Sequence, residues 1–155
     1  MDKATLNLLN AADDPQESEA PKGFDYVKEI EAVERIKPEL ERIVGRLFVL
    51  DENVQDASFF TELSIRQSEL EYMAGIGNVI LTVLAIRFSA FGKLFTVWSN
   101  STKEKVNRNL IDEVVATLQD HGYVYVDADA LQESYTGSHT DFKDTTWWLR
   151  FFDYI

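Results

Sequence analysis

The order of hydrophobic and polar residues predicts a long first helix between residues 24 and 47. Its apolar positions recur at helical spacing and form one stripe at 100° per residue. They are Val33, Ile36, Leu40, Ile43, Val44 and Leu47. Pro38 lies inside this pattern, where a proline removes one amide donor and crowds the preceding turn. Because the stripe stays in phase across Pro38, one kinked helix is favoured over two helices with Pro38 in the first turn of the second.

A second helix is predicted between residues 101 and 121. Ser101 and Glu104 have the spacing of a capping box, and Gly122 follows His121 at the position of a left-handed helix cap. The apolar positions between these signals are Val106, Leu110, Ile111, Val114, Val115 and Leu118. They share one broad face, so this helix should also cover a core.

The middle of the chain predicts strands. Residues 57–66 alternate between apolar and polar side chains, which is typical of a strand with one solvated face. Residues 79–89 are rich in β-branched and aliphatic side chains and predict a strand that is covered on both faces. A short connection at 90–92 then returns the chain through 93–99 as a hairpin partner. Residues 68–73 are ambiguous and resemble the start of a short helical turn.

The last third predicts two further strands. Residues 123–126 form the first, 127–132 a turn or short helix, 133–144 a polar loop, and 145–154 the second strand. The resulting order is one helix, three strands, one helix and two strands. This order predicts an α+β fold with a mainly antiparallel sheet of about five strands and two principal helices packed on one face.

The domain organisation follows from where apolar side chains are missing. Residues 10–23 contain two prolines and no large apolar side chain. Such a segment buries too little to offset its ordering entropy, so residues 1–23 are predicted to be a flexible acidic tail. Residues 24–155 are predicted to form a single α+β domain.

Composition excludes several classes of protein. The chain has 155 residues, 45% of them hydrophobic, and no cysteine. It can therefore form no disulfide or cysteine-ligated zinc site, and it has no thiol nucleophile. The longest apolar stretch, residues 79–86, is too short to cross a bilayer, and residues 1–10 lack the apolar core of a secretory signal. We expect a cytoplasmic protein.

The net charge of −12 is unevenly distributed. Residues 1–31 hold eight acidic and three basic side chains, and residues 112–155 hold nine and two, whereas residues 32–111 hold ten of each. Such a surface repels phosphate groups, so neither nucleic acid nor an anionic membrane is expected as a partner. It would attract a basic protein, or it serves solubility alone.

Two loop features carry candidate chemistry. Ser138, His139 and Asp141 offer a nucleophile, a base and an orienting carboxylate, although no strained turn of the Gly-x-Ser-x-Gly type supports the serine. Asp127 and Asp129 end a predicted strand and suit Mg²⁺ or Ca²⁺ only if the later loop adds oxygen ligands. The simpler interpretation is that one of them caps the following turn. We therefore expect no catalytic residue, no metal and no cofactor.

The last ten residues are unusually aromatic. Interpreted as a strand, they direct Trp147, Leu149 and Phe151 to one face. The opposite face carries Trp148, Arg150, Phe152 and Tyr154. Tryptophan, tyrosine and arginine are enriched at the energetic centres of protein interfaces. This face is therefore a candidate binding platform, with a second layer of core as the alternative.

The leading hypothesis is a non-enzymatic acidic protein-binding module, similar in charge and size to inhibitors or immunity-type partners of basic proteins. Its predicted site is the row Trp148, Arg150, Phe152 and Tyr154 with an acidic rim of Asp141, Asp144 and Asp153. One alternative is a small hydrolase or metal-dependent enzyme that uses residues 127–141. Another is a homodimer that pairs through the C-terminal strand.

Overall fold

Most of the predicted elements are present in the computed structural model, which describes residues 1–66, 71–73, 77–79, 82–101 and 106–155. The helices are α1 (Lys3–Ala12), α2 (Tyr26–Val44), α3 (Arg108–Asp120) and α4 (Trp147–Phe152), with 3₁₀ turns η1 (Ala130–Gln132) and η2 (Thr140–Phe142). The strands are β1 (Val49–Asp51), β2 (Phe59–Arg66), β3 (Glu71–Met73), β4 (Gly77–Val79), β5 (Thr82–Ser89), β6 (Leu94–Trp98) and β7 (Val124–Tyr125). The fold is α+β, as predicted.

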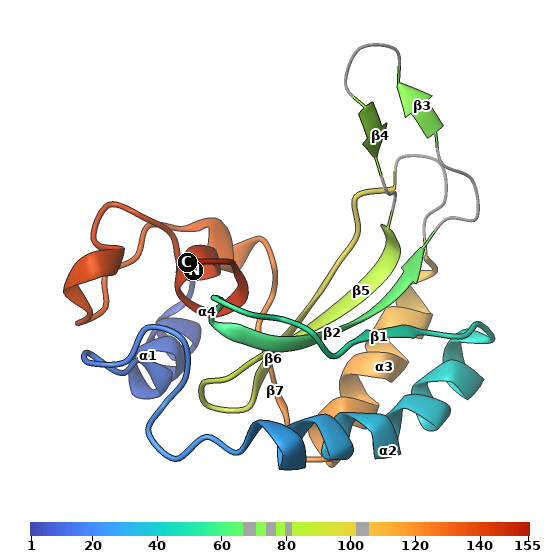
Figure 1. Cartoon of the computed structure of the whole chain (residues 1–155), viewed down its shortest axis with the longest axis horizontal. Coiled ribbons are helices and arrows are strands. Elements are labelled where there is room, and N and C mark those ends of the chain that lie inside the picture. The colour runs from blue at the N-terminus through green and yellow to red at the C-terminus, as the bar shows by residue number, and fades with distance from the viewer. Residues whose placement is uncertain (67–70, 74–76, 80–81, 102–105) are drawn as a thin grey trace.

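Five strands form one sheet in the order β1-β2-β5-β6-β7. All neighbours are antiparallel except β6 and β7, which are parallel because α3 forms the crossover between them. The predicted hairpin of β5 and β6 is confirmed, with Arg87 opposite Thr96. Strands β3 and β4 form a separate hairpin that projects beyond the main sheet (Figure 1).

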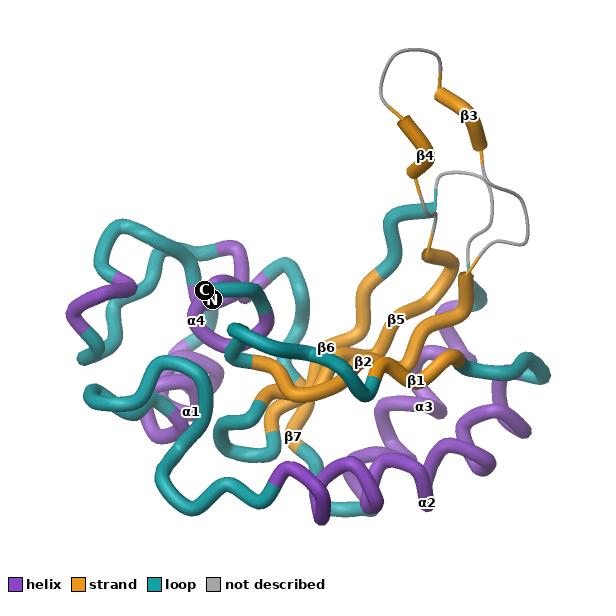
Figure 2. The backbone as a smooth tube through the Cα atoms, viewed as in Figure 1, coloured by secondary structure: helices purple, strands orange, loops and turns teal. Residues whose placement is uncertain are grey.

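The two principal helices, α2 and α3, cover the same face of this sheet, as predicted (Figure 2). The core between helices and sheet includes Val33, Ile36, Leu40, Leu63, Ile86, Phe88, Phe95, Val114 and Leu118. Helix α2 runs unbroken through Pro38 and ends at Gly45, whose φ of +72° is the left-handed conformation of a helix cap. The in-phase stripe thus correctly predicted one helix.

Several predicted boundaries differ from the structure. Helix α2 ends at Val44, and Leu47, predicted to lie on its apolar face, is 79% exposed beyond the helix. Helix α3 begins after Asn107, whose side chain accepts a hydrogen bond from the Asn109 amide, and not at Ser101. Glu104, the second member of the predicted capping box, lies outside the described residues. The helix ends at Asp120 with His121 as its cap, and Gly122 follows in the predicted left-handed conformation, with a φ of +84°. Of the ambiguous segment 68–73, residues 71–73 form strand β3, and the rest lies outside the described residues.

The predicted C-terminal strand is wrong, because residues 147–152 form helix α4. The Thr146 hydroxyl caps this helix by accepting a hydrogen bond from the Leu149 amide. One turn apart, the rings of Trp147 and Phe151 stack with centroids 5.8 Å apart. The segment is apolar at both odd and even positions, so its pattern did not distinguish a strand from a helix buried on most sides.

The N-terminal segment also differs from the predicted mobile tail. Leu9 of α1 is fully buried in a second apolar cluster, which lies on the side of the sheet opposite α2 and α3 and contains Phe91, Leu94, Val126, Leu131, Trp147, Phe151 and Phe152. Residues 13–18 then wrap around Arg150, which donates to the main-chain carbonyls of Asp14, Glu17 and Ser18. Every residue has a main-chain carbonyl, whatever its side chain. The amino-acid composition of residues 13–18 therefore could not predict that this segment binds Arg150. These hydrogen bonds hold the segment after α1 against α4.

Candidate functional site

The predicted binding row is not a continuous surface. Arg150 and Phe152 are fully buried, whereas Trp148 is half-buried and Tyr154 is 53% exposed. The cause is the helical geometry of α4, which turns successive side chains by 100° instead of alternating them. The prediction of one exposed row is therefore wrong, because two of its four members belong to the core.

The predicted acidic rim is divided in the same way. Asp153 lies beside the remaining aromatic residues and accepts a hydrogen bond from Trp148 Nε1 at 3.1 Å. Asp141 and Asp144 are exposed in the loop that precedes α4, and no hydrogen bond or ion pair in the described part of the chain joins them to Trp148 or Tyr154. Only Asp153 remains part of a candidate site.

Arg150 is the centre of a buried polar network. Its Nε donates to Asp13 Oδ1 at 2.7 Å, and its guanidinium lies 4.2 Å from the Phe91 ring centroid. Asp13 also accepts hydrogen bonds from the Tyr135 hydroxyl and the Ser138 amide. Burial raises the pKa of Asp13, but the hydrogen bonds from Tyr135 and Arg150 outweigh it, so this pKa lies below its ordinary value. The network holds the chain ends together and offers no free group.

The proposed nucleophile, base and orienting group are not assembled. Ser138 Oγ donates to Asp13 and not to a histidine. His139 Nδ1 accepts a hydrogen bond from the Asp141 amide, so this nitrogen carries no proton, and the neutral ring must hold its proton on Nε2. Nε2 therefore donates to Ser18 Oγ at 3.2 Å and cannot accept a proton from it. The hydrogen bond between His139 and Ser18 therefore joins two segments of the chain and does not activate a nucleophile.

Asp127 and Asp129 lie in a turn that follows β7. Asp127 Oδ1 accepts a hydrogen bond from the Asp129 amide at 2.9 Å, which is the capping role favoured by the sequence. Within the described residues, no group of three or more histidine, aspartate or glutamate side chains is placed to hold a metal ion.

A surface cluster that the sequence did not predict surrounds Arg87 of β5. Its guanidinium donates to Glu62 Oε2 at 2.8 Å and to the Phe152 carbonyl at 2.6 Å. It also lies 4.2 Å from the ring of Phe59, 5.3 Å from Trp98 and 5.5 Å from Trp148. The two indoles meet edge to face, and the exposed Tyr154 ring rests on Phe59. We call Phe59, Arg87, Trp98, Trp148 and Tyr154 the aromatic patch.

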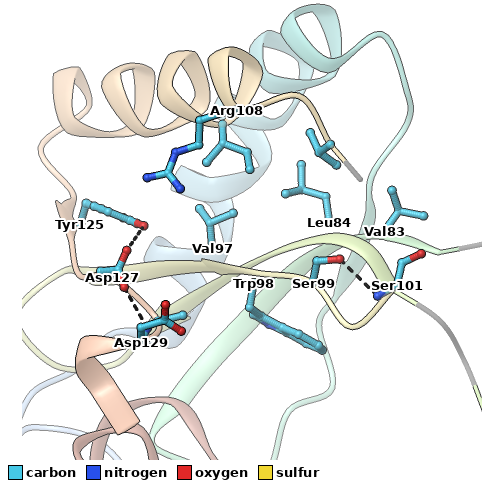
Figure 3. Close-up of a pocket in the computed structure, with 13 residues that line it drawn as sticks. Val83, Leu84, Val97, Trp98, Ser99, Ser101, Arg108, Tyr125, Asp127 and Asp129 are labelled. Carbon is cyan, nitrogen blue, oxygen red and sulfur yellow. Dashed lines mark hydrogen bonds between the residues drawn. The ribbon is translucent and has the colours of Figure 1, made fainter. Parts of the chain in front are cut away.

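A cleft of about 500 Å³ lies between α3 and the sheet (Figure 3). We call it the α3 cleft. Val83, Leu84 and Val97 of the strands face Val106 and Ile111 of the α3 side. Tyr125, Asp127 and Asp129 form a polar end, and Ser99 and Ser101 lie at the other (Figure 3). Trp98 lines the cleft and also belongs to the aromatic patch, but its ring lies on the opposite side of β6 from Val97 and α3 (Figure 3). The two features therefore occupy opposite faces of the sheet and share only Trp98.

The polar end of the α3 cleft carries excess negative charge. The Tyr125 hydroxyl donates to Asp127 Oδ2 at 3.4 Å. Burial, together with the charge of Asp127, raises the pKa of Tyr125 to about 12, so the phenol stays protonated at neutral pH. Arg108 extends towards this end, but it is also paired with Asp112 on its own helix at 3.7 Å (Figure 3). Within the described residues, the Asp129 carboxylate has neither a hydrogen bond nor an ion pair.

Both features combine residues that are distant in sequence, so local sequence patterns indicated only some of their members. The aromatic patch joins β2, β5, β6 and the C-terminal segment, and the α3 cleft joins β5, β6, α3 and the segment after β7. One signal was available: Arg87 is a lone charge within the apolar run 79–89. A charge at such a position needs a partner, and here that partner is Glu62.

Comparison of the chain with protein-family models, curated proteins and solved structures gave no match. Among the described residues, no helix has the length and apolar character needed to span a bilayer.

Proposed function

We propose that this protein is a non-enzymatic binding module whose partner is a basic protein. The observation that carries the proposal is the aromatic patch, in which two half-buried indoles lie around Arg87 and an exposed tyrosine packs on the neighbouring Phe59. This is the composition of interface energetic centres, where aromatic rings and arginine supply most of the binding free energy. The proposal includes the cytoplasmic location expected from the sequence.

The patch is rigid before any partner arrives. Arg87 is held by Glu62 and by the Phe152 carbonyl, and its side chain is only 13% exposed. Trp98 Nε1 donates to Glu62, and Trp148 Nε1 donates to Asp153. A partner that covers these rings would therefore immobilise few new side chains, which lowers the entropic cost of association.

The charge distribution supports a basic partner. The two acidic portions of the sequence, residues 1–31 and 112–155, supply α1, α4 and the loops around them, which gather at one end of the molecule (Figure 2). They also supply the start of α2 and most of α3, which lie outside this end (Figure 2). The patch residues Trp148 and Tyr154 belong to this end. A cationic surface would be attracted to it, which speeds and orients encounter.

The proposal is tested by capture followed by measurement. The immobilised chain is used to capture a partner from a lysate of its source cells, and the purified partner is then titrated by calorimetry. We expect a partner with an isoelectric point above about 8, bound more weakly as salt increases. Trp148→Ala should weaken binding about 30-fold, the effect of losing about 2 kcal/mol at an interface centre.

Two controls separate binding from folding. Tyr154→Ala removes an exposed ring and should weaken binding without lowering the melting temperature. Leu47→Ala changes a side chain that is 79% exposed but lies outside the patch, and it should leave the affinity unchanged. If the partner binds Trp148→Ala and Tyr154→Ala as tightly as the unmodified chain, the patch is not the interface. The predicted homodimer is not part of the proposal, because the strand that was to pair is helix α4.

A further inference from the structure

We propose that the α3 cleft binds an arginine or lysine side chain, with the aliphatic stem between α3 and the sheet and the cation at Asp127 and Asp129. The inference rests on the proposed function in one respect. The arginine or lysine side chain would come from the basic partner that covers the aromatic patch. Trp98 lines the cleft and belongs to the patch, but the two features occupy opposite faces of the sheet, so the partner would have to extend around β6 to contact both (Figure 3).

The shape of the cleft fits a long side chain with one charged end. Its walls between the sheet and α3 are aliphatic, with Val97 on one side and Ile111 on the other. Its polar features lie at the ends (Figure 3). Arginine and lysine place an apolar stem along such walls and keep the charged head at the polar rim.

The charge of the polar end favours a cation. Asp129 has no hydrogen-bond or ion-pair partner for its carboxylate in the described residues, and each Asp127 oxygen that already accepts one hydrogen bond can accept another. A guanidinium or ammonium at this end would make charge-assisted hydrogen bonds, which are shorter and stronger than neutral ones. Within the described chain, neither Asp127 nor Asp129 forms an ion pair that would have to break before it binds this cation.

Arg108 is an internal competitor for the same place. Its guanidinium extends towards Tyr125 and Asp127, yet its ion pair with Asp112 is long and its side chain is 81% exposed (Figure 3). An exposed ion pair of this kind contributes little, so a bound cation can displace Arg108. Removal of Arg108 should therefore tighten the binding of a cation, whereas it would abolish the binding of an anion.

The test is a titration of the ¹⁵N-labelled full chain with acetyl-Gly-Arg-Gly-amide, followed by NMR chemical shifts. The citrulline analogue, which has nearly the same shape without the charge, is the neutral probe. We expect saturable shifts of the Val97, Tyr125 and Asp129 amides with the arginine probe and at least tenfold weaker binding of the citrulline probe. Arg108→Ala should tighten arginine binding two- to fivefold.

A matched pair of variants separates the cleft from general acidity. Asp127→Asn with Asp129→Asn should weaken arginine binding at least tenfold, whereas Asp141→Asn with Asp144→Asn removes the same charge from exposed loop positions and should leave it within twofold. Shifts spread over the acidic surface, equal effects of both pairs, or weaker binding in Arg108→Ala would overturn the inference. A partner that binds through the aromatic patch while the arginine probe fails to bind would refute the cleft and leave the proposed function intact. If the arginine probe binds in the cleft but no partner binds through the aromatic patch, the proposed function is refuted and the inference about the cleft stands.

Discussion

Asp13 and Arg150 form a fully enclosed ion pair that joins the two ends of the chain. The two side chains are 1% and 0% exposed, and the Arg150 guanidinium makes three further hydrogen bonds to carbonyls of the N-terminal segment. A buried charge is tolerated only when it is paired and hydrogen-bonded on most sides. The ion pair therefore explains why a segment without large apolar side chains is ordered.

Arg150→Ala should cause a large loss of stability. The substitution leaves the Asp13 carboxylate buried without its counter-charge, and breaking a buried pair in this way costs about 3–5 kcal/mol. Urea unfolding followed by circular dichroism measures the change. Arg35→Ala is the matched control, because Arg35 forms an exposed pair with Glu31 and its loss should cost less than about 0.5 kcal/mol. Equal effects of the two substitutions would show that the Asp13–Arg150 pair does not hold the chain ends.

Asp13 should also make the protein sensitive to acid. Its pKa in the folded state lies below the ordinary value of 3.8, so the folded protein binds this proton more weakly than the unfolded chain. The stabilisation from this carboxylate is present above pH 3.8 and is lost as the pH falls through the folded pKa. We expect the free energy of unfolding of Asp13→Asn to be lower at neutral pH and to fall less steeply below pH 4. A parallel acid dependence in both proteins would contradict this.

Alkaline pH should destabilise the protein through its buried tyrosines. Burial is the main cause that raises the pKa of Tyr123, Tyr125 and Tyr135 from 10 to about 12. A raised pKa means that the folded protein holds the proton more tightly, so stability is complete below pH 10 and falls as the pH rises towards 12. Absorbance at a phenolate wavelength should show these three rings ionising above pH 10. Their ionisation near pH 10 in the folded protein would disprove the burial described.

Tyr123→Phe should stabilise the protein. The Tyr123 hydroxyl is buried without a hydrogen-bond partner in the described structure, and such a group costs about 1–3 kcal/mol. Removing it should raise the free energy of unfolding by about 1 kcal/mol. Tyr26→Phe is the opposite control, because the Tyr26 hydroxyl donates to the Glu52 carbonyl and its loss should lower stability. Destabilisation by Tyr123→Phe would indicate that the hydroxyl has a partner after all.

The fold could be predicted from the sequence where one face of an element is polar. The stripe through Pro38 correctly predicted α2, and the alternation in residues 57–66 correctly predicted a strand. The predicted solvated face of that strand is wrong, because Ser58, Phe60 and Ser64 are buried and a bulge between Phe59 and Thr61 shifts the alternation. The C-terminal segment lacks a polar face because α4 is buried on several sides, so its periodicity was uninformative. The candidate site was predicted only in part: Trp148 and Tyr154 lie in the aromatic patch, whereas its central Arg87 and its Trp98 come from strands whose pairing brings them there.

The central claim is that a basic protein covers the aromatic patch. Hydroxyl-radical footprinting of the chain, alone and in complex with the captured partner, tests it residue by residue. We predict that oxidation of Trp148 and Tyr154 falls several-fold in the complex, while the exposed Leu47 is oxidised equally in both. Unchanged oxidation of Trp148 and Tyr154 in the saturated complex would contradict the claim.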